Sequence, residues 1–589
     1  RVLEGVRFLL ELQLVKGGDA FLYIVEIDHL TFTYPGAEEP TLKDLSLTVE
    51  DGDFLAVVGN NGCGKSTLCK TLNGLIPHFI VGDMEGMVKI DGVDTREQEI
   101  GSLAKKAGYV YQDFENQIVC PTVLEDASYA CLNYAVKDYE ARGKEALRIC
   151  GLSSKISDYV WQLSGGQKHL LALAGAAALS PDILILDEPI AQLDPAHADQ
   201  IYEVLKAWNE TYHKTIIVIE HHTEYIAKYC KHVLLLKDGK AAWKLPAREA
   251  MRRTEELRGS NIFPPQVTIA AGRMVQEGML PEDTTLPVNL EEGKNLFEGY
   301  MKNRTGCIRQ SFIPTEGEQM AAFENVSVKY RAVKGKAPKI LDHFNLTIQK
   351  GEKVALIGSN GAGKSTILKM MMGLIQPEIG SVLLKGRPVR ALSKEEIGEI
   401  ISLVYQNPEE MFIKDSIRED ISYAMRVRRI PEYEKRTDDL LEMFRLGNLS
   451  GRDGRLLSGG QMRRASLAIG VALNPEILLL DEPTANLDIA TRREVMETLR
   501  MLKGITDTVI IATHDMQLVC DWAERIIVLS GGRVIADGTK EQIFADLYVR
   551  NQVGIRPPQI YDMGRLIGIE NPCFTIDEFL DCFRGECYA

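Results

Sequence analysis

One glycine-rich pattern occurs twice in this chain and constrains its fold more than any other feature. Each copy follows an apolar, strand-like run and precedes a helix-compatible segment, which is the context that a phosphate-binding loop requires. The glycines let backbone N–H groups point inward at phosphate oxygens, and the following helix adds a favourable dipole. The two copies read Gly59-Asn60-Asn61-Gly62-Cys63-Gly64-Lys65-Ser66-Thr67 and Gly358-Ser359-Asn360-Gly361-Ala362-Gly363-Lys364-Ser365-Thr366.

Two side chains of each loop have predictable roles. Lys65 and Lys364 are expected to reach the β- and γ-phosphates of a nucleotide. Ser66 and Ser365 are expected to bind Mg²⁺ through their hydroxyl groups. The sequence therefore predicts two nucleotide sites in one chain.

The two loops belong to a long internal repeat. Asp481 follows Asp187 by 294 residues, and His514 follows His221 by 293. A period of this length lies far outside the range of solenoid repeats, so the chain is predicted to be a tandem duplication of one domain. The expected parts are an N-terminal extension (residues 1–24), a first domain (25–245), its tail and a linker (246–319), a second domain (320–547) and a C-terminal tail (548–589).

Composition narrows the class of protein. A chain of 589 residues is too long for one hydrophobic core, and no run approaches the roughly 18 apolar residues of a membrane-spanning helix. The net charge of −15 argues against a surface built to neutralise nucleic-acid phosphates. The eleven cysteines are scattered without C-x-x-C pairs, which favours reduced thiols over a disulfide framework or a zinc site.

Paired carboxylates follow the most apolar runs of each half. Ile183-Leu184-Ile185-Leu186 leads into Asp187 and Glu188, and the second half repeats this pattern with Asp481 and Glu482. Continuous apolar runs indicate strands buried on both faces of a parallel sheet. Adjacent carboxylates at such a strand end are costly to desolvate unless a metal or a reaction uses them. We expect the aspartates to hold Mg²⁺ and the glutamates to polarise an attacking water.

Further motifs recur in the same order in both halves. A lone strand tyrosine is more often a packing residue, a lone Ser-Gly-Gly-Gln is a weak signal, and a lone histidine is usually structural. Their paired placement favours base stacking for the tyrosines, anion binding for the Ser-Gly-Gly-Gln segments and γ-phosphate sensing for the histidines. The pairs are Tyr34 and Tyr330, Gln112 and Gln406, Ser164-Gly165-Gly166-Gln167 and Ser458-Gly459-Gly460-Gln461, Asp194 and Asp488, and His221 and His514.

This order of motifs resembles that of the ATP-binding-cassette (ABC) ATPases over residues 25–245 and 320–547. The resemblance implies an α/β fold with two tandem P-loop NTPase domains, each with a RecA-like core, an antiparallel β subdomain and a helical subdomain. It also implies ATP hydrolysis with Mg²⁺. In that family two cassettes face head to tail, so that the phosphate loop of one and the signature segment of the other enclose each ATP.

Carried onto this chain, the resemblance implies two composite sites. The catalytic groups would be Lys65, Glu188 and His221 in one site and Lys364, Glu482 and His514 in the other. The magnesium ligands would be Ser66, Gln112 and Asp187, and Ser365, Gln406 and Asp481. The first site would also contain Tyr34, residues Gly59 to Thr67, Ser458 to Gln461 and Asp488; the second would contain Tyr330, residues Gly358 to Thr366, Ser164 to Gln167 and Asp194.

A finer resemblance, to the ATPases of energy-coupling-factor importers, rests on four short segments. These are residues 112–118 and 406–412, together with Phe263-Pro264-Pro265-Gln266-Val267 and Arg556-Pro557-Pro558-Gln559-Ile560. It implies the energy-coupling subunit of an importer for a vitamin, a metal ion or another small solute. The implied partners are a membrane-embedded coupling protein and a small membrane substrate-binding subunit, with this chain at the cytoplasmic face of the membrane and no nucleic acid bound.

Two other functions fit the same cassettes. A soluble twin-cassette ATPase acting on ribosomes or nucleic acid tends to have a basic helical connector, whereas residues 245–320 here have nearly balanced charge. If the chain were a twin ATPase of the sugar-importer type, the Pro-Pro-Gln segments would be a coincidence.

The two halves differ in sequence near the predicted sites. Lys168-His169-Leu170 stands where the second half has Met462-Arg463-Arg464, and Glu220 stands in place of Thr513. None of these differences removes a catalytic group, so both sites are expected to hydrolyse ATP, although not necessarily at equal rates.

Overall fold

The computed structural model describes residues 23–190, 193, 195–301, 317–329, 339–359, 361–484, 489–502 and 504–584. Tyr330, Asn360, Asp194, Asp488 and residues 1–22 of the predicted extension lie outside these described residues. Contacts divide the chain near residue 264 into two compact units. Each unit contains one of the two phosphate loops.

The first unit is organised by a six-stranded sheet with the order β10-β9-β3-β8-β7-β6. Strands β3, β7 and β8 are buried along their whole length, as their uninterrupted apolar sequences predict for a sheet covered on both faces. The β3, β6, β7, β8 and β9 pairings are parallel, and only β10 runs antiparallel to its neighbour. The strands are β3 (Phe54–Val58), β6 (Ala107–Val110), β7 (Ile183–Asp187), β8 (Thr215–Ile219), β9 (His232–Lys237) and β10 (Lys240–Pro246).

An antiparallel sheet with the order β2-β1-β4-β5 packs beside this core. Strand β2 alternates buried and exposed residues, because one face lies on the core and the other meets solvent. Phe32 of β1 and Leu55 of β3 belong to one hydrophobic cluster, so the two sheets share a core. The strands are β1 (Tyr23–Thr33), β2 (Leu42–Glu50), β4 (Asp83–Ile90) and β5 (Val93–Asp94).

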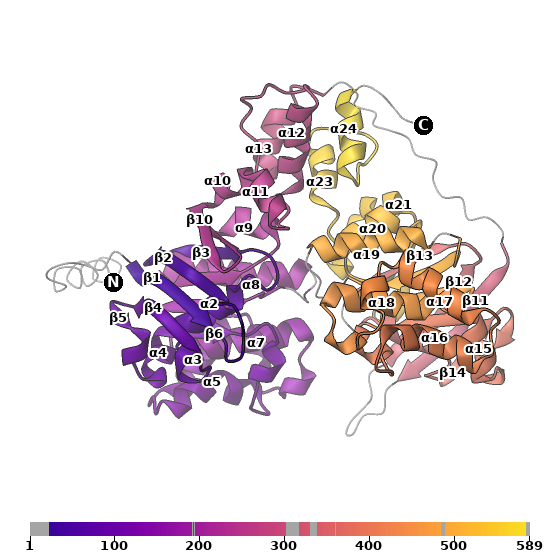
Figure 1. The fold of residues 1–589 in the computed structure, drawn as a ribbon, viewed down its shortest axis with the longest axis horizontal. Coiled ribbons are helices and arrows are strands. Elements are labelled where there is room, and N and C mark those ends of the chain that lie inside the picture. Colours follow the sequence, from indigo (N-terminus) through magenta and orange to yellow (C-terminus); the bar gives the residue numbers. More distant parts are fainter. Residues whose placement is uncertain are drawn as a thin grey trace. The chain divides into compact units, whose positions relative to one another are not determined.

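Helices complete the first unit (Figure 1). Helices α5 and α6 pack on each other and on α7, and so form the helical subdomain that follows the glutamine segment. The helices are α2 (Lys65–Leu72), α3 (Leu75–His78), α4 (Ile100–Lys106), α5 (Val123–Asn133), α6 (Tyr139–Ile149), α7 (Gly165–Ala177), α8 (Pro195–Tyr212), α9 (Thr223–Tyr229), α10 (Ala247–Arg252) and α11 (Thr254–Gly259), with a 3-10 turn η2 (Phe114–Gln117).

The second unit repeats this architecture. Its six-stranded sheet has the order β16-β17-β18-β13-β19-β20, and its antiparallel sheet has the order β12-β11-β14-β15. The strands are β11 (Gln319–Lys329), β12 (Lys339–Gln349), β13 (Lys353–Gly358), β14 (Ile379–Leu384), β15 (Arg387–Pro388), β16 (Ile401–Val404), β17 (Ile477–Asp481), β18 (Thr508–Ala512), β19 (Arg525–Ser530) and β20 (Arg533–Gly538). The helices are α14 (Lys364–Met371), α15 (Lys394–Ile400), α16 (Ile417–Val427), α17 (Tyr433–Met443), α18 (Gly459–Val471), α19 (Ile489–Met501), α20 (Met516–Trp522), α21 (Lys540–Ala545) and α22 (Leu547–Val553), with a 3-10 turn η6 (Pro408–Met411).

Both sheet orders are the same when corresponding strands are compared, and each matches the predicted α/β fold with an antiparallel β subdomain and a helical subdomain. The fold prediction is therefore confirmed for both halves. Among the described helices, none is long and apolar enough to cross a membrane.

Four helices from two distant parts of the chain pack together in the second unit. They are α12 (Gln266–Gln276), α13 (Leu290–Phe297), α23 (Gln559–Leu566) and α24 (Ile576–Arg584). Each Pro-Pro-Gln segment starts a helix, and the two glutamines cap each other's helix. Gln266 Oε1 accepts the N–H of Ile560 at 2.9 Å, and Gln559 Oε1 accepts the N–H of Val267 at 3.1 Å. The linker predicted from sequence therefore contains helices that pack against the C-terminal tail.

Candidate active sites

The phosphate loops adopt backbone conformations that only glycine tolerates at several positions. In the first loop Gly59 has φ +153° and Gly64 has φ +104°. A Cβ atom on Gly59 would lie 2.2 Å from the carbonyl oxygen of Leu236, so even alanine would force the loop open. Gly363 of the second loop has φ +101°, the counterpart of Gly64. The repeated glycine spacing therefore corresponds to a repeated loop shape.

The loop lysines fold over the backbone of their own loops. Lys65 Nζ donates to the carbonyl oxygens of Gly59 at 2.8 Å and Asn60 at 2.9 Å. Lys364 Nζ donates to the carbonyl oxygen of Gly358 at 2.7 Å. Both side chains are largely buried, so each ammonium group is positioned at the loop instead of in solvent. This places a positive charge where the phosphates of a nucleotide are expected.

The serine after each lysine faces the aspartate at the end of a central strand. Ser365 Oγ donates to Asp481 Oδ1 at 3.1 Å, and the hydroxyl of Ser66 interacts with Asp187 at the matching place in the first unit. Burial raises the pKa of both aspartates, and the interaction with the neighbouring serine partly opposes that rise. A serine hydroxyl beside a buried carboxylate is a hard oxygen donor set, which fits Mg²⁺.

The glutamate predicted to be catalytic and the predicted histidine meet in each unit. Glu188 and Glu482 have φ +49° and +45°, a strained conformation for non-glycine residues that is common at functional sites. His221 Nε2 lies 3.2 Å from Glu188 Oε1, and His514 Nδ1 lies 3.0 Å from Glu482 Oε1. Although burial opposes both shifts, the hydrogen bonds lower the pKa of Glu188 and raise the pKa of His514. The strand ends thus bring each predicted pair together.

The glutamine segments differ between the two units. The side-chain amide of Gln112 donates to Glu188 Oε2 at 2.9 Å, so its nearest site contact is the glutamate and not Asp187. No hydrogen bond joins Gln406 to Glu482, both of which the structure describes. Instead, the backbone at Gln406 is held by Arg463, whose Nη2 donates to its carbonyl oxygen at 2.8 Å. Sequence reasoning listed Arg463 only as a difference between the halves and assigned it no role.

Tyr34 lies beside the first phosphate loop. Its hydroxyl is 3.1 Å from Thr67 Oγ1, and its ring packs edge-on against Phe32 with centroids 5.0 Å apart. A half-buried aromatic ring next to the loop can stack on a purine base, as the sequence predicts. Its counterpart Tyr330 lies outside the described residues.

The Ser-Gly-Gly-Gln segments start helices α7 and α18. The side chain of Ser164 accepts the N–H of Gln167 at 3.3 Å, while Gln167 Oε1 accepts the N–H of Ser164 at 3.1 Å. Ser458 and Gln461 form the same capping box. A Cβ on Gly165 would meet no atom within 4 Å, which leaves this helix start open to an approaching group.

Two further residues near the sites were not assigned by sequence reasoning. The hydroxyl of Tyr109 donates to Asp187 Oδ2 at 3.2 Å. Glu220 Oε1 accepts the N–H groups of His221 at 2.7 Å and His222 at 2.9 Å, and so holds the loop that carries the site histidine. The replacement of threonine by a glutamate at this position was the only sequence signal for that role.

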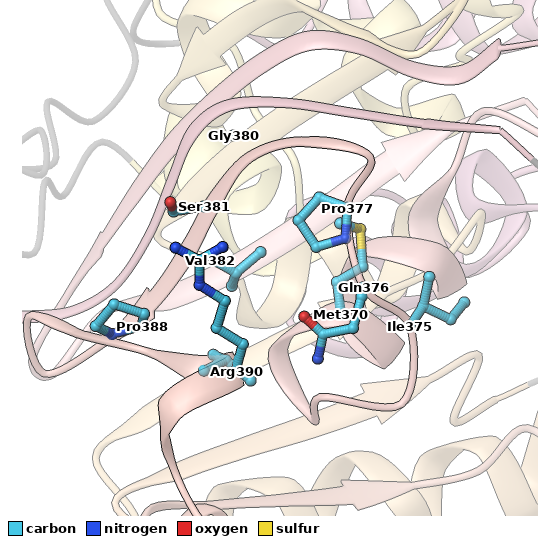
Figure 2. Close-up of a pocket in the computed structure, with 10 residues that line it drawn as sticks. Met370, Ile375, Gln376, Pro377, Gly380, Ser381, Val382, Pro388 and Arg390 are labelled. Atoms are coloured by element: carbon cyan, nitrogen blue, oxygen red, sulfur yellow. The ribbon is translucent and has the colours of Figure 1, made fainter.

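A separate pocket lies away from both loops. Figure 2 shows it beside β14 of the second unit, with Arg390, Pro377 and Met370 around it. Its volume of about 40 Å³ holds one or two water molecules and is too small for a nucleotide. None of the predicted site residues lines it.

The chain is similar in sequence to known proteins of one family. The family profile described as ABC transporter matches residues 42–191 and 341–485. A protein of Methanosarcina acetivorans, provisionally named an ABC transporter ATP-binding protein, is 30% identical over 588 residues, covering 96% of this chain and 94% of that protein. A Bacillus cereus protein with the same provisional name is 32% identical over 579 residues, covering 96% and 99%. The chain is also similar to the solved structure of CbiO1 from Clostridium perfringens, which is described as part of the ABC transporter complex CbiONQ. The two sequences are 32% identical, and the match covers 43% of this chain and 100% of that chain with a TM-score of 0.36.

Proposed function

Because this chain belongs to the ABC transporter family and carries two ATPase cassettes that use ATP and Mg²⁺, we propose that it is the energy-coupling subunit of an importer. We assign it to the energy-coupling-factor type, which takes up a vitamin, a metal ion or another small solute. It would work at the cytoplasmic face of the membrane with a coupling protein and a small substrate-binding membrane subunit.

The observation that carries this proposal is the reciprocal capping at the Pro-Pro-Gln segments. These segments are among those that resemble energy-coupling-factor ATPases, and each places a glutamine at a helix start. Because Gln266 and Gln559 cap each other's helix, both segments have a shared structural role in this chain. That role argues against a chance match, which the sugar-importer alternative would require.

We further propose that the two cassettes form composite sites head to tail. Each site would take its phosphate loop, carboxylates and histidine from one cassette and its Ser-Gly-Gly-Gln helix start from the other. Mg²⁺ held by the serine and aspartate of each site would supply positive charge beside the phosphates. The loop lysine and the helix N-termini stabilise the remaining negative charge, since N–H groups and positive side chains surround the γ-phosphate.

The hydrolytic step would use the glutamate–histidine pair. Glu188 or Glu482 accepts a hydrogen bond from the attacking water and orients it toward the γ-phosphate. The histidine next to it holds the carboxylate in place and would contact the γ-phosphate of bound ATP. ATP would close the two cassettes on each other, and hydrolysis would release them.

An exposed apolar surface next to the first glutamine segment fits a membrane partner. Val119, Tyr159 and Trp161 are 61%, 47% and 67% exposed, and the rings of Tyr159 and Trp161 stack with centroids 4.4 Å apart. Asp126 of α5 holds this surface in shape by accepting the N–H of Val119 at 2.8 Å. Ile413 and Leu456 are exposed at the corresponding surface of the second cassette. Apolar side chains at this position suit a helical segment of the coupling protein.

Co-purification from the native cell tests the proposal. We expect the tagged chain, extracted from membranes in mild detergent, to bring down a multi-span coupling protein and a small membrane subunit whose ligand is the solute. Recovery of ribosomes, or of no membrane protein, would contradict the importer function and support the soluble alternative. Recovery with a soluble binding protein would support the sugar-importer alternative.

A surface variant makes this test specific. Trp161→Glu should reduce recovery of the membrane partner about tenfold or more, because interface aromatics often contribute over about 2 kcal/mol, while leaving ATP hydrolysis in detergent within about twofold. The control is Tyr548→Glu, since Tyr548 is equally exposed at 67% but lies on α22, far along the chain from the glutamine segments. Equal recovery with both variants would show that the Trp161 surface is not the docking site.

A further inference from the structure

The signature helix of the second cassette is bonded to its own glutamine segment by one buried arginine. Arg463 lies on α18 and is 2% exposed. Its Nη1 donates to the carbonyl oxygen of Tyr405 at 3.0 Å, and its Nη2 donates to that of Gln406 at 2.8 Å. Two hydrogen bonds from one rigid, planar guanidinium fix both the position and the direction of the peptide that leads into the segment.

The buried charge also faces the catalytic carboxylates. Burial lowers the pKa of Arg463 to about 10, while attraction to Asp481 and Glu482 opposes this change. The group therefore stays protonated at neutral pH. Its Nε has no hydrogen-bond partner among the described residues, so the contacts to the glutamine segment and the charges of the site are what stabilise it there.

The first cassette has a histidine at the matching position. His169 lies on α7, is 3% exposed and stacks on Phe114 with ring centroids 4.3 Å apart. Neither ring nitrogen has a hydrogen-bond partner within the described part of the chain, and burial lowers the pKa of His169 to about 4. A neutral ring that makes an aromatic contact cannot hold the two carbonyl groups that Arg463 holds.

The glutamine side chains differ accordingly. In the first cassette, where the segment is not held by an arginine, Gln112 donates to Glu188 and occupies an acceptor site of that carboxylate. His221 occupies another. In the second cassette, Gln406 makes no hydrogen bond to Glu482, although the structure describes both residues. Oε2 of Glu482 instead accepts the backbone N–H of His514 at 3.3 Å, so the Gln406 side chain, unlike that of Gln112, does not engage the glutamate.

We infer that Arg463 is a positioning residue that ties the glutamine segment of the second cassette to its signature helix, and that His169 leaves the first cassette without this tie. With its glutamine segment held by Arg463 and its glutamine side chain not engaged by the glutamate, the site that contains Glu482 turns over faster than the site that contains Glu188. This inference rests on the proposed assignment of Gln406 and Glu482 to one site.

Single-site backgrounds of the full chain test the inference. Glu188→Gln leaves turnover to the Glu482 site, and Glu482→Gln leaves it to the Glu188 site. In the first background we expect Arg463→Met to lower kcat about tenfold and to change the KM for ATP less than about twofold. The reason is that the substitution disturbs the geometry of the transition state but leaves nucleotide binding intact. In the second background the loss should stay below about threefold. Arg463→Lys should recover part of the lost kcat, since it keeps the charge and one donor.

The matched control removes a neighbouring arginine from the same helix. Arg464 pairs with Glu494 and corresponds to Leu170 of the first cassette. Arg464→Leu should change kcat less than about twofold in both backgrounds. If Arg463→Met does not fold, Arg463→Lys decides the question by itself through a loss confined to the Glu482 site.

Three results would overturn the inference. They are equal losses of kcat in the two backgrounds, a raised KM with unchanged kcat, and a lysine variant as damaged as the methionine variant. A failure of the underlying site assignment would look different. In that case Glu482→Gln alone would leave ATP hydrolysis unchanged, whatever the Arg463 variants do.

Discussion

The two cassettes have the same strand order and the same predicted catalytic groups, yet they hold those groups in different ways. In the second, a buried arginine fixes the glutamine segment, and a threonine precedes the site histidine. In the first, an aromatic stack replaces the arginine, and Glu220 holds the backbone of the histidine loop. The comparison shows that both halves contain the same predicted reacting groups, whereas the residues that support these groups differ.

The largest expected effect comes from removing the catalytic glutamates. Glu188→Gln and Glu482→Gln should each lower turnover at their own site about a hundredfold or more, because a positioned general base contributes about 10² to 10⁴ in rate. Since we expect the Glu482 site to be faster, Glu482→Gln should remove the larger share of total ATP hydrolysis. Steady-state phosphate release from the purified chain measures both.

If the two variants hydrolyse ATP at equal residual rates, the proposed difference in turnover between the two cassettes is wrong. Full activity in either variant would mean that its site does not turn over. ATP binding serves as the control measurement, because neither substitution removes a phosphate-loop group.

An intermediate effect is expected at the loop that precedes the site histidine. Glu220→Thr copies the second cassette but leaves the hydroxyl of Tyr202, which now donates to Glu220 Oε2 at 2.8 Å, without its buried partner. The free energy of unfolding should fall by about 1–3 kcal/mol, the usual cost of an unsatisfied buried polar group. Chemical denaturation of the full chain measures the loss.

The matched variant is Thr513→Ser in the second cassette, which keeps the hydroxyl that accepts the N–H of Asp515. It should change the stability by less than about 0.5–1 kcal/mol. If Glu220→Thr proves as stable as the parent chain, the support role assigned to Glu220 is wrong.

The smallest effect is expected at Cys63, which stands where the second phosphate loop has Ala362. The sequence places this thiol in the phosphate loop. It therefore predicts that a thiol reagent blocks this site and that bound ATP protects the thiol from the reagent. In the structure Cys63 is 7% exposed, and burial raises its pKa, so the reactive thiolate is scarce.

We therefore expect maleimide to inactivate the parent chain and Cys63→Ala at rates that agree within about twofold, since a buried, protonated thiol reacts slowly. The measurement is ATP hydrolysis after timed exposure to the reagent. Rapid inactivation that ATP prevents, and that Cys63→Ala abolishes, would show that the loop opens enough to expose the thiol.

Much of the fold followed from local patterns in the sequence. The phosphate loops, the buried strands and the aspartate–glutamate pairs were predictable because each depends on residues adjacent in the chain: glycine spacing, continuous apolar runs and a change from apolar to acidic residues. The repeat then showed that the same fold occurs twice. The family comparison confirmed these predictions of two ATP-binding cassettes.

The support of the sites depends on residues that are distant in the sequence. Arg463 reaches Gln406 across 57 residues, and Gln266 caps a helix 294 residues away. No local pattern encodes such a contact, since each hydrogen bond forms only when packing brings a donor within about 3 Å of an acceptor. The sequence alone thus determined which groups can carry out the chemistry, whereas the tertiary structure decided how firmly each cassette holds them, because burial and hydrogen bonding are properties of the packed chain.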